Sequence, residues 1–424
     1  MVERAGRSQT VKSGVVVAVA TGVMNAATYA FTLLCAHVLG PADYGAFAAM
    51  LGLVIVVNVV SLGLQATGAR RVAATPGDRH LIESKVIATS VRAGIALAIV
   101  CLALSPVIAA VLQLDSWVTA ALLAVPALSF AIMGGQAGIL QGEGRWFPLA
   151  VVFSSLGLAR LGIGAVFLAF RPDALGAVLG GVAVAAVVPV LVGAAALRRA
   201  SAQAAAESLP PASGRSHSRI VREAMMSSHA LLAFFALATI DIVVARTALD
   251  AHPAGIYAAG LILVKAVQFL PQFVTVVAFP AMARQGGGHR VHLGGLGLIL
   301  LIGGTATMVV GIWGDLALPF VGGDAYAEVV PRLWVFATIG TLLAAVQLLV
   351  YSALARAHHR AVLFLWGAVA AILVSTPWVD SVGRLLMVTV SVDLALLLVL
   401  LFVTRLGSRR AAPDDRPVRA AATA

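Results

Sequence analysis

The sequence carries little charge for its length. Asp, Glu, Lys and Arg make up 11% of its 424 residues, whereas hydrophobic residues make up 61% and the mean hydropathy is +1.00. A soluble domain has about 25% charged residues, so this chain has too few to cover a water-facing surface. Aromatic residues are also scarce, at 6%, and small or aliphatic residues supply the apolar bulk. Gly and Ala at this density let helices approach closely, as they do in membrane bundles.

Signals for enzymatic and metal chemistry are missing. The two cysteines, Cys35 and Cys101, both lie in apolar segments and make neither a disulfide framework nor a metal site. The sequence has no P-loop, no G-x-S-x-G or H-E-x-x-H motif and no Cys/His metal spacing, so we expect no enzyme, no cofactor and no bound metal. We also expect no cleavable signal peptide, because the first apolar segment is long enough to span a bilayer and no A-x-A-like site ends it.

The net charge of +11 does not indicate nucleic-acid binding. The basic residues lie mainly in loops on one side of the apolar segments, where they fix topology and contact anionic headgroups. No basic helix or aromatic platform is present for a nucleic acid. Membrane lipids are therefore the expected partners of this charge.

Apolar segments long enough to cross a bilayer recur along the whole chain. A span needs about 20 apolar residues. Twelve such segments predict an all-α polytopic membrane protein: 14–36, 46–67, 87–111, 118–139, 148–170, 174–197, 224–247, 255–281, 293–314, 331–354, 361–379 and 385–405. The division between the fifth and sixth spans rests on a short polar break at Arg171, Pro172 and Asp173.

The basic residues are distributed unequally about these spans. Of the 29 Lys and Arg residues, 22 fall on the side of the N-terminus, four on the opposite side and three within spans. Cytoplasmic loops carry the excess of Lys and Arg, so both termini are expected to be cytoplasmic. The even number of spans agrees with this orientation.

The spans divide into two related halves. An N-terminal segment (1–13) precedes a six-helix bundle over 14–197, and a polar linker over 198–223 leads to a second bundle over 224–406. A basic tail over 407–424 is expected to be disordered and cytoplasmic. The motif PADYG at 41–45 resembles PAGIY at 253–257, and two further loop pairs match at similar offsets. These matches predict a parallel six-span repeat with a substrate site between the halves, near the midplane.

Five charged residues within or near the ends of spans are candidate functional residues, because charge is costly to place in a membrane. Arg160 lies in the fifth span, Asp241 and Arg246 in the seventh, Lys265 in the eighth and Asp393 in the twelfth. Asp241 and Lys265, on antiparallel neighbours, are expected to form an ion pair that is either structural or functional. Arg246 is either an interfacial residue or a ligand for the substrate. Asp393 either faces a helix interface or carries a proton.

Uncharged polar residues and one proline complete the candidate site. Most Asn and Gln residues in spans hold helices together, and Asn25 and Gln268 are the two that we place nearest to a central cavity. Pro271 removes a helical hydrogen bond and predicts a kink, which is either static or a bending point for gating.

Four loop motifs carry a resemblance to a known family. They are residues 38–47 after the first span, 255–259 together with Lys265 in the eighth, 320–326 before the tenth and 141–145 after the fourth. Over about residues 10–405, the chain resembles the polysaccharide/O-antigen-type lipid-linked oligosaccharide flippases of the multidrug/oligosaccharidyl-lipid/polysaccharide exporter superfamily.

The resemblance implies two six-helix bundles around a central cavity lined mainly by the first, second, seventh and eighth spans. It implies alternating access that moves an undecaprenyl-diphosphate-linked oligosaccharide from the cytoplasmic to the outer leaflet of a bacterial cytoplasmic membrane, for cell-surface polysaccharide synthesis. Lys265, Arg160 and Arg246 would bind the diphosphate. A polysaccharide polymerase or glycosyltransferases would be partners.

Other functions stay open on the sequence alone. An ion-coupled multidrug exporter of the same superfamily would use Asp241 and Asp393 for H⁺ or Na⁺ and would have an apolar cavity. A flippase for lipid-linked peptidoglycan precursors is a further candidate, although such proteins tend to be longer. A non-transporting component of a polysaccharide-synthesis complex would have a filled centre. The charge and filling of the centre therefore discriminate among them.

Overall fold

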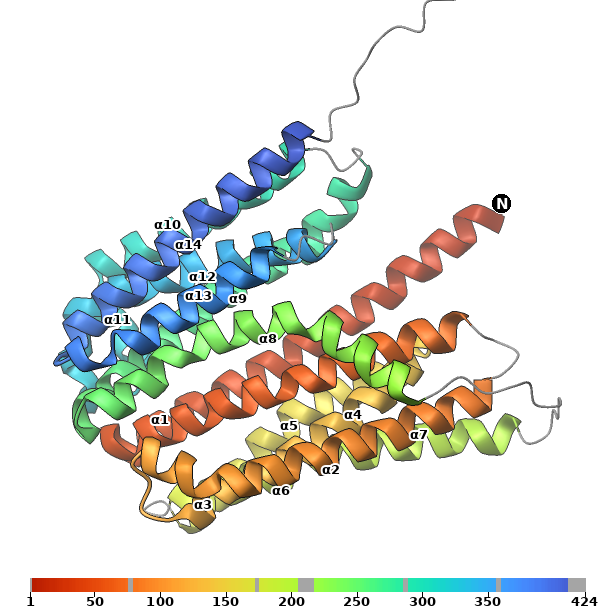
Figure 1. Cartoon of the computed structure of the whole chain (residues 1–424), viewed down its shortest axis with the longest axis horizontal. Coiled ribbons are helices and arrows are strands. Elements are labelled where there is room, and N and C mark those ends of the chain that lie inside the picture. The colour runs from red at the N-terminus through yellow and green to blue at the C-terminus, as the bar shows by residue number, and fades with distance from the viewer. Residues whose placement is uncertain are drawn as a thin grey trace, which may run out of the picture.

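The computed structural model describes the backbone of residues 2–74, 79–171, 175–204, 217–284, 289–355 and 360–410. Side chains are described for residues 14–74, 81–171, 175–198, 229–269, 294–351 and 361–403. Throughout these ranges the chain is built from helices and turns, without a strand (Figure 1). Residues 205–216 of the predicted linker (198–223) and residues 411–424 of the predicted tail (407–424) fall outside the described residues, and the described remainder of both segments is helical.

The first six predicted spans correspond to seven helices. Both the first and second spans lie in α1 (Val2–Ala74), and the third is α2 (Arg79–Val111). The fourth is divided between α3 (Trp117–Ala121) and α4 (Ala124–Gly142), and the fifth is α5 (Trp146–Phe170). The sixth is divided between α6 (Leu175–Ala185) and α7 (Val188–Ala204).

The last six spans follow the same order. The seventh to ninth are α8 (His217–Ala248), α9 (Ala251–Arg284) and α10 (His289–Ile312). Three short elements, α11 (Gly314–Ala317), η2 (Leu318–Phe320) and η3 (Asp324–Arg332), lead into α12 (Leu333–Ala355), which is the tenth. The eleventh is α13 (Arg360–Val374), followed by η4 (Thr376–Trp378), and the twelfth is α14 (Val382–Arg410).

These helices confirm the predicted all-α polytopic fold. Within the described residues, nine helices are long and apolar enough to cross a membrane. Because α1 holds two spans, these nine helices account for ten of the predicted spans. The other two are α9 and the shorter α13.

A sharp turn divides α1 into two arms. Gly40 has φ 70° and ψ 168°, outside the helical region, and Pro41 follows it. Glycine reaches positive φ without the steric clash that a Cβ atom causes, and proline lacks the amide hydrogen that a continuous helix would use. We call residues 2–39 the first arm and residues 41–74 the second arm, which runs back from the turn (Figure 1).

The two halves pack by the same scheme. In the first half, α4 lies against α2, α7 and the second arm of α1; in the second half, α12 lies against α10, α14 and α9, which are the helices six spans later. Likewise α5 packs on the first arm of α1, and α13 packs on α8. A parallel repeat of six spans predicts this correspondence.

Glycines hold the equivalent helices close together in both halves. A Cβ atom added to Gly138 of α4 would lie 2.6 Å from the carbonyl oxygen of Gln65, in the second arm. A Cβ atom added to Gly340 of α12 would lie 2.6 Å from the carbonyl oxygen of Val264, in α9. Since lipid is as apolar as the side chains, such close packing takes the place of the hydrophobic effect between membrane helices.

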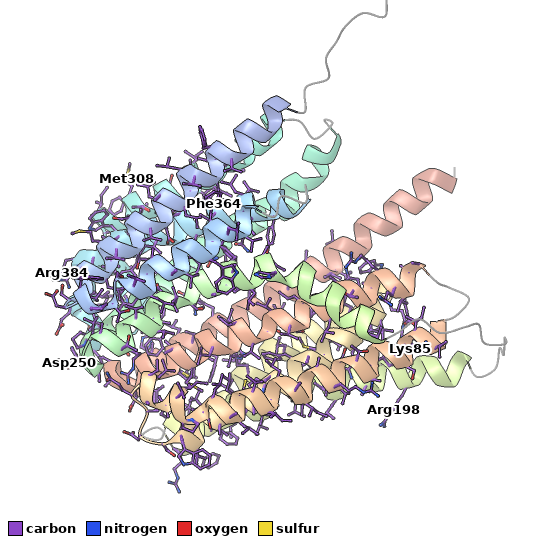
Figure 2. All side chains as sticks on the ribbon, in the orientation of Figure 1. Lys85, Arg198, Asp250, Met308, Phe364 and Arg384 are labelled. Atoms are coloured by element: carbon purple, nitrogen blue, oxygen red, sulfur yellow. The ribbon has the colours of Figure 1, made fainter. Side chains whose placement is uncertain are left out.

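Exposed tryptophans mark one edge of the predicted membrane region. Trp117, Trp313, Trp334 and Trp378 are at least half exposed and lie at or beside the helix ends on the side of the Gly40 turn. Tryptophan gathers at membrane interfaces, where its ring stays in the apolar region and its N–H reaches water. Lys85 and Arg198 lie at the opposite end of the first half (Figure 2).

The halves meet at the end that carries the Gly40 turn and spread apart toward the other end (Figure 1). Contacts between them are made mainly by α1 with α8 and α9, and by α2 with α8. A Cβ atom on Gly45 would lie 3.0 Å from the Cα of Gly255, and the Tyr326 hydroxyl donates a hydrogen bond of 3.0 Å to the carbonyl oxygen of Ala36. We call the end with the Gly40 turn, where the halves meet, the closed end, and the opposite end, where they separate, the spread end.

We expect Gly255→Ala to destabilise the closed end. The new methyl group would overlap the carbonyl oxygen of Pro41 in the other half, and overpacking of a tight contact costs roughly 1–3 kcal/mol or more. Gly297→Ala in α10 is the matched control, because a Cβ atom there meets nothing within 4 Å. Thermal unfolding of the purified variants in detergent measures the difference. Equal melting temperatures for the two variants would show that the contact does not constrain the protein.

Candidate functional site

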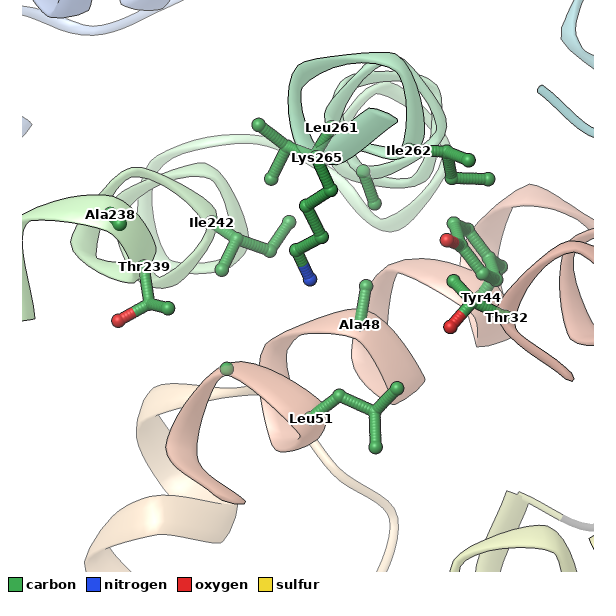
Figure 3. A pocket seen from close by; sticks show the side chains of 12 residues that line it. Thr32, Tyr44, Ala48, Leu51, Ala238, Thr239, Ile242, Leu261, Ile262 and Lys265 are labelled. Carbon is green, nitrogen blue, oxygen red and sulfur yellow. The ribbon is translucent and has the colours of Figure 1, made fainter. Parts of the chain in front are cut away.

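A small pocket lies between the halves, where both arms of α1 face α8 and α9 (Figure 3). Its polar lining residues are Thr32, Tyr44, Thr239 and Lys265, and the rest of its lining is aliphatic. The cavity has a volume of about 20 Å³, enough for one or two water molecules. In this conformation the pocket is therefore far too small for an oligosaccharide.

Lys265 reaches into this pocket from α9. Its ammonium group points between Ile242 of α8 and Ala48 of the second arm (Figure 3). Among the described residues it makes no hydrogen bond and no ion pair within 4.0 Å. A lysine in an apolar pocket without such a partner keeps its donors free for a ligand.

Arg160 approaches Lys265 from the opposite half. It lies in α5, is partly buried, and is close enough for an electrostatic interaction with Lys265. It too has no hydrogen bond or ion pair with the part of the chain that the structure describes. Two cations from different halves thus lie within electrostatic range of each other.

Asp241 has a partner that the sequence did not suggest. Its carboxylate is 3% exposed and accepts a hydrogen bond of 2.8 Å from the hydroxyl of Tyr257 and another of 2.8 Å from the backbone N–H of Ile242. Lys265 lies within electrostatic range of Asp241, although the two side chains do not form a salt bridge within 4.0 Å. The expected pairing is therefore a longer-range attraction.

Asp393 adds a second carboxyl to the same region. It lies in α14, is 1% exposed and is within electrostatic range of Asp241. Its Oδ1 atom is buried and has no hydrogen-bond partner among the described residues. The hydroxyl of Thr389, also in α14, contacts that of Tyr257. We call Asp241, Tyr257, Thr389 and Asp393 the acidic cluster.

The remaining predicted residues are placed elsewhere. Arg246 is at the closed end, where it donates hydrogen bonds to the carbonyl oxygens of Leu112 and Gln113, and it does not line the pocket. Asn25 and Gln268 are partly exposed in α1 and α9, and neither lines the pocket. Pro271 lies in α9 beyond the residues whose side chains the structure describes, so the predicted gating kink stays a prediction.

Tyr257 is the main residue that sequence reasoning missed. In the sequence it stands out only as the last residue of the repeated motif at 253–257. Asp241 lies eight residues before Leu249, at the turn between α8 and α9, and Tyr257 lies eight residues after it. Antiparallel neighbours bring such residues to the same depth, and this spacing is the signal that would have found the pair.

Solved structures with the same fold include MATE family transporters. The chain is 12% identical to an inward-facing MATE family multidrug resistance transporter of the MOP superfamily, covering 92% of this chain and 96% of that one with a TM-score of 0.68. It is 13% identical to an outward-facing structure of such a transporter (95% and 97% covered, TM-score 0.54) and 12% identical to the eukaryotic MATE transporter AtDTX14 (94% and 96% covered, TM-score 0.55). These likenesses establish the fold, which has twelve helices in two bundles.

A family assignment comes from the sequence itself. Comparison with curated protein sequences gives no significant match. The family model described as polysaccharide biosynthesis protein matches residues 10–285, which is more than half of the chain. This match shows that the chain belongs to the polysaccharide biosynthesis protein family, and its many long apolar helices make it a multi-pass membrane protein.

Proposed function

We propose that the protein is a flippase that moves a polyprenyl-diphosphate-linked oligosaccharide from the cytoplasmic to the outer leaflet by alternating access. The observation that carries the proposal is that Lys265 and Arg160, from opposite halves, lie within electrostatic range of each other, and no carboxylate of the described residues is in direct contact with either. A diphosphate is a strong acceptor of charge-assisted hydrogen bonds from such groups. The lipid tail stays in the bilayer while the sugars cross between the halves.

The observed conformation suits the loading step. The basic residues predict that the spread end is cytoplasmic, and the spread end is where a substrate made in the cytoplasm would enter. The higher TM-score to an inward-facing structure than to an outward-facing one supports the same orientation. Closure of the spread end and opening of the closed end would then release the substrate in the outer leaflet of a bacterial cytoplasmic membrane, where a polysaccharide polymerase would use it.

We expect Lys265→Met and Arg160→Met each to lower transport by about tenfold or more, because each removes a charge-assisted contact with the diphosphate. Lys265→Arg should keep most of the activity. Arg384→Met is the matched control, since Arg384 is exposed and its ion pair with Asp380, at 2.7 Å, lies within one half. Lipid-linked sugars that accumulate in a deletion strain carrying each variant, measured by mass spectrometry, report transport. Accumulation no greater than in the control would remove both residues from the substrate site.

We further propose that the acidic cluster couples transport to an H⁺ or Na⁺ gradient. A buried carboxyl group without a partner is costly unless a proton or a cation satisfies it. Asp241 of the cluster lies within electrostatic range of Lys265. Binding of a proton or cation to the cluster therefore changes the electrostatic potential at the substrate site. No resident cofactor is needed in this scheme.

For this coupling we expect Asp393→Asn to abolish the stimulation of transport by an imposed gradient, because the neutral amide neither releases a proton nor binds a cation. Asp380→Asn, which alters an exposed carboxyl group of the same half, should keep the stimulation. Initial rates in proteoliposomes with a pH gradient or a Na⁺ gradient separate the two ions. Full stimulation of the Asp393 variant by both gradients would refute the coupling role.

A second candidate is an ion-coupled multidrug exporter. The mostly aliphatic lining of the pocket and the buried carboxyl groups beside it favour this function. Deletion of the gene discriminates the two, because loss of an exporter changes drug susceptibility, whereas loss of the flippase leaves lipid-linked sugars in the cytoplasmic leaflet.

A further inference from the structure

Arg246 joins the two halves at the closed end. It belongs to α8 in the second half, and its guanidinium group donates hydrogen bonds of 3.1 and 2.9 Å to the carbonyl oxygen of Leu112 and one of 3.2 Å to that of Gln113, both in the first half. The side chain is 3% exposed, and its Nη1 atom is buried without a hydrogen-bond partner among the described residues. The three hydrogen bonds that this arginine does make persist only while the halves touch.

The acceptors are the free carbonyl groups at the end of α2. The N–H of Leu114 donates to the carbonyl oxygen of Ala109 at 2.9 Å, and that of Gln113 to Ala110 at 3.3 Å, which is the pattern of a Schellman turn. Gln113 has φ 51°, the left-handed conformation that glycine usually provides at this place. The turn leaves the carbonyls of Leu112 and Gln113 pointing outward, at the negative end of the helix dipole, where a cation is favoured.

Two carboxylates of the first half also lie near Arg246. Asp43, at the start of the second arm, and Asp115, between α2 and α3, are both within electrostatic range of its guanidinium group. The other side-chain hydrogen bonds between the halves in the described residues are those of Tyr326 with the carbonyl oxygen of Ala36 and of Tyr29 with that of Phe320. All of them involve residues in or beside the loops of the closed end.

We propose that Arg246 is a latch that holds the closed end shut and thereby sets the balance between the two orientations of the transporter. Opening of this end separates the guanidinium group from two carbonyl oxygens and two carboxylates of the first half at once. Because charge-assisted hydrogen bonds in a region of low dielectric are strong, the latch favours the observed conformation. The inference rests on the proposed alternating access and assigns Arg246 a conformational role in place of substrate binding.

Distances across the closed end test the latch directly. Spin labels at Val118 in the first half and Asp250 in the second, on a background with Cys35→Ala and Cys101→Ala, report the separation of the halves in the purified protein. We expect Arg246→Gln to raise the ratio of long to short distances by about tenfold or more, as the loss of charged hydrogen bonds implies. Arg246→Lys should have an intermediate effect, because an ammonium group lacks the planar fork that bonds two acceptors.

Two further variants keep the test decisive. Arg384→Gln should leave the distances unchanged, since that residue pairs within its own half. Tyr326→Phe removes one hydroxyl hydrogen bond between the halves and should shift the ratio in the same direction by a smaller factor. Unchanged distances in a folded Arg246→Gln protein would overturn the latch; if that variant does not fold, unchanged distances in both Arg246→Lys and Tyr326→Phe would do so. The labels need no substrate, so failure of the transport proposal is measured separately.

Discussion

A bilayer offers no hydrogen bonds, so each polar group within it needs a partner inside the protein. This constraint explains why the described chain is helical and why irregular backbone gathers at helix ends such as the Gly40 turn. It also explains the role of Gln136, whose amide donates a hydrogen bond of 3.1 Å to the carbonyl oxygen of Val190, beside the break between α6 and α7. Polar groups that still lack partners therefore stand out as candidates for function.

Three sets of charged groups lie between the halves or beside them. Lys265 and Arg160 approach each other from opposite bundles, Asp393 is buried in the second half, and Arg246 spans the closed end. Each of these groups is costly in the observed state unless something binds it or holds it. We propose a substrate anion as the partner of Lys265 and Arg160, and a coupling ion as the partner of Asp393. The carbonyl groups at the end of α2 bind Arg246 in the observed conformation.

Much of the fold follows from the sequence, because hydrophobic length, basic loops and the repeated motif at 41–45 and 253–257 are all local signals. Lys265 and Arg160 were also identifiable, since a charge in an apolar span is conspicuous. The partners of the buried groups were not. Asp241 bonds to Tyr257 instead of pairing directly with Lys265, and Arg246 bonds to backbone carbonyl groups whose availability depends on the turn at Gln113. Such contacts depend on three-dimensional placement, which composition and spacing do not encode.

The central claim is that the protein itself moves a lipid-linked oligosaccharide between leaflets. The most direct measurement is the fraction of a polyprenyl-diphosphate-linked oligosaccharide that an impermeant glycosidase reaches from outside proteoliposomes containing only the purified protein. The account predicts that the protected inner-leaflet fraction becomes accessible in wild-type vesicles and stays protected in vesicles with Lys265→Met. Equal protection in wild-type vesicles and protein-free vesicles would contradict it.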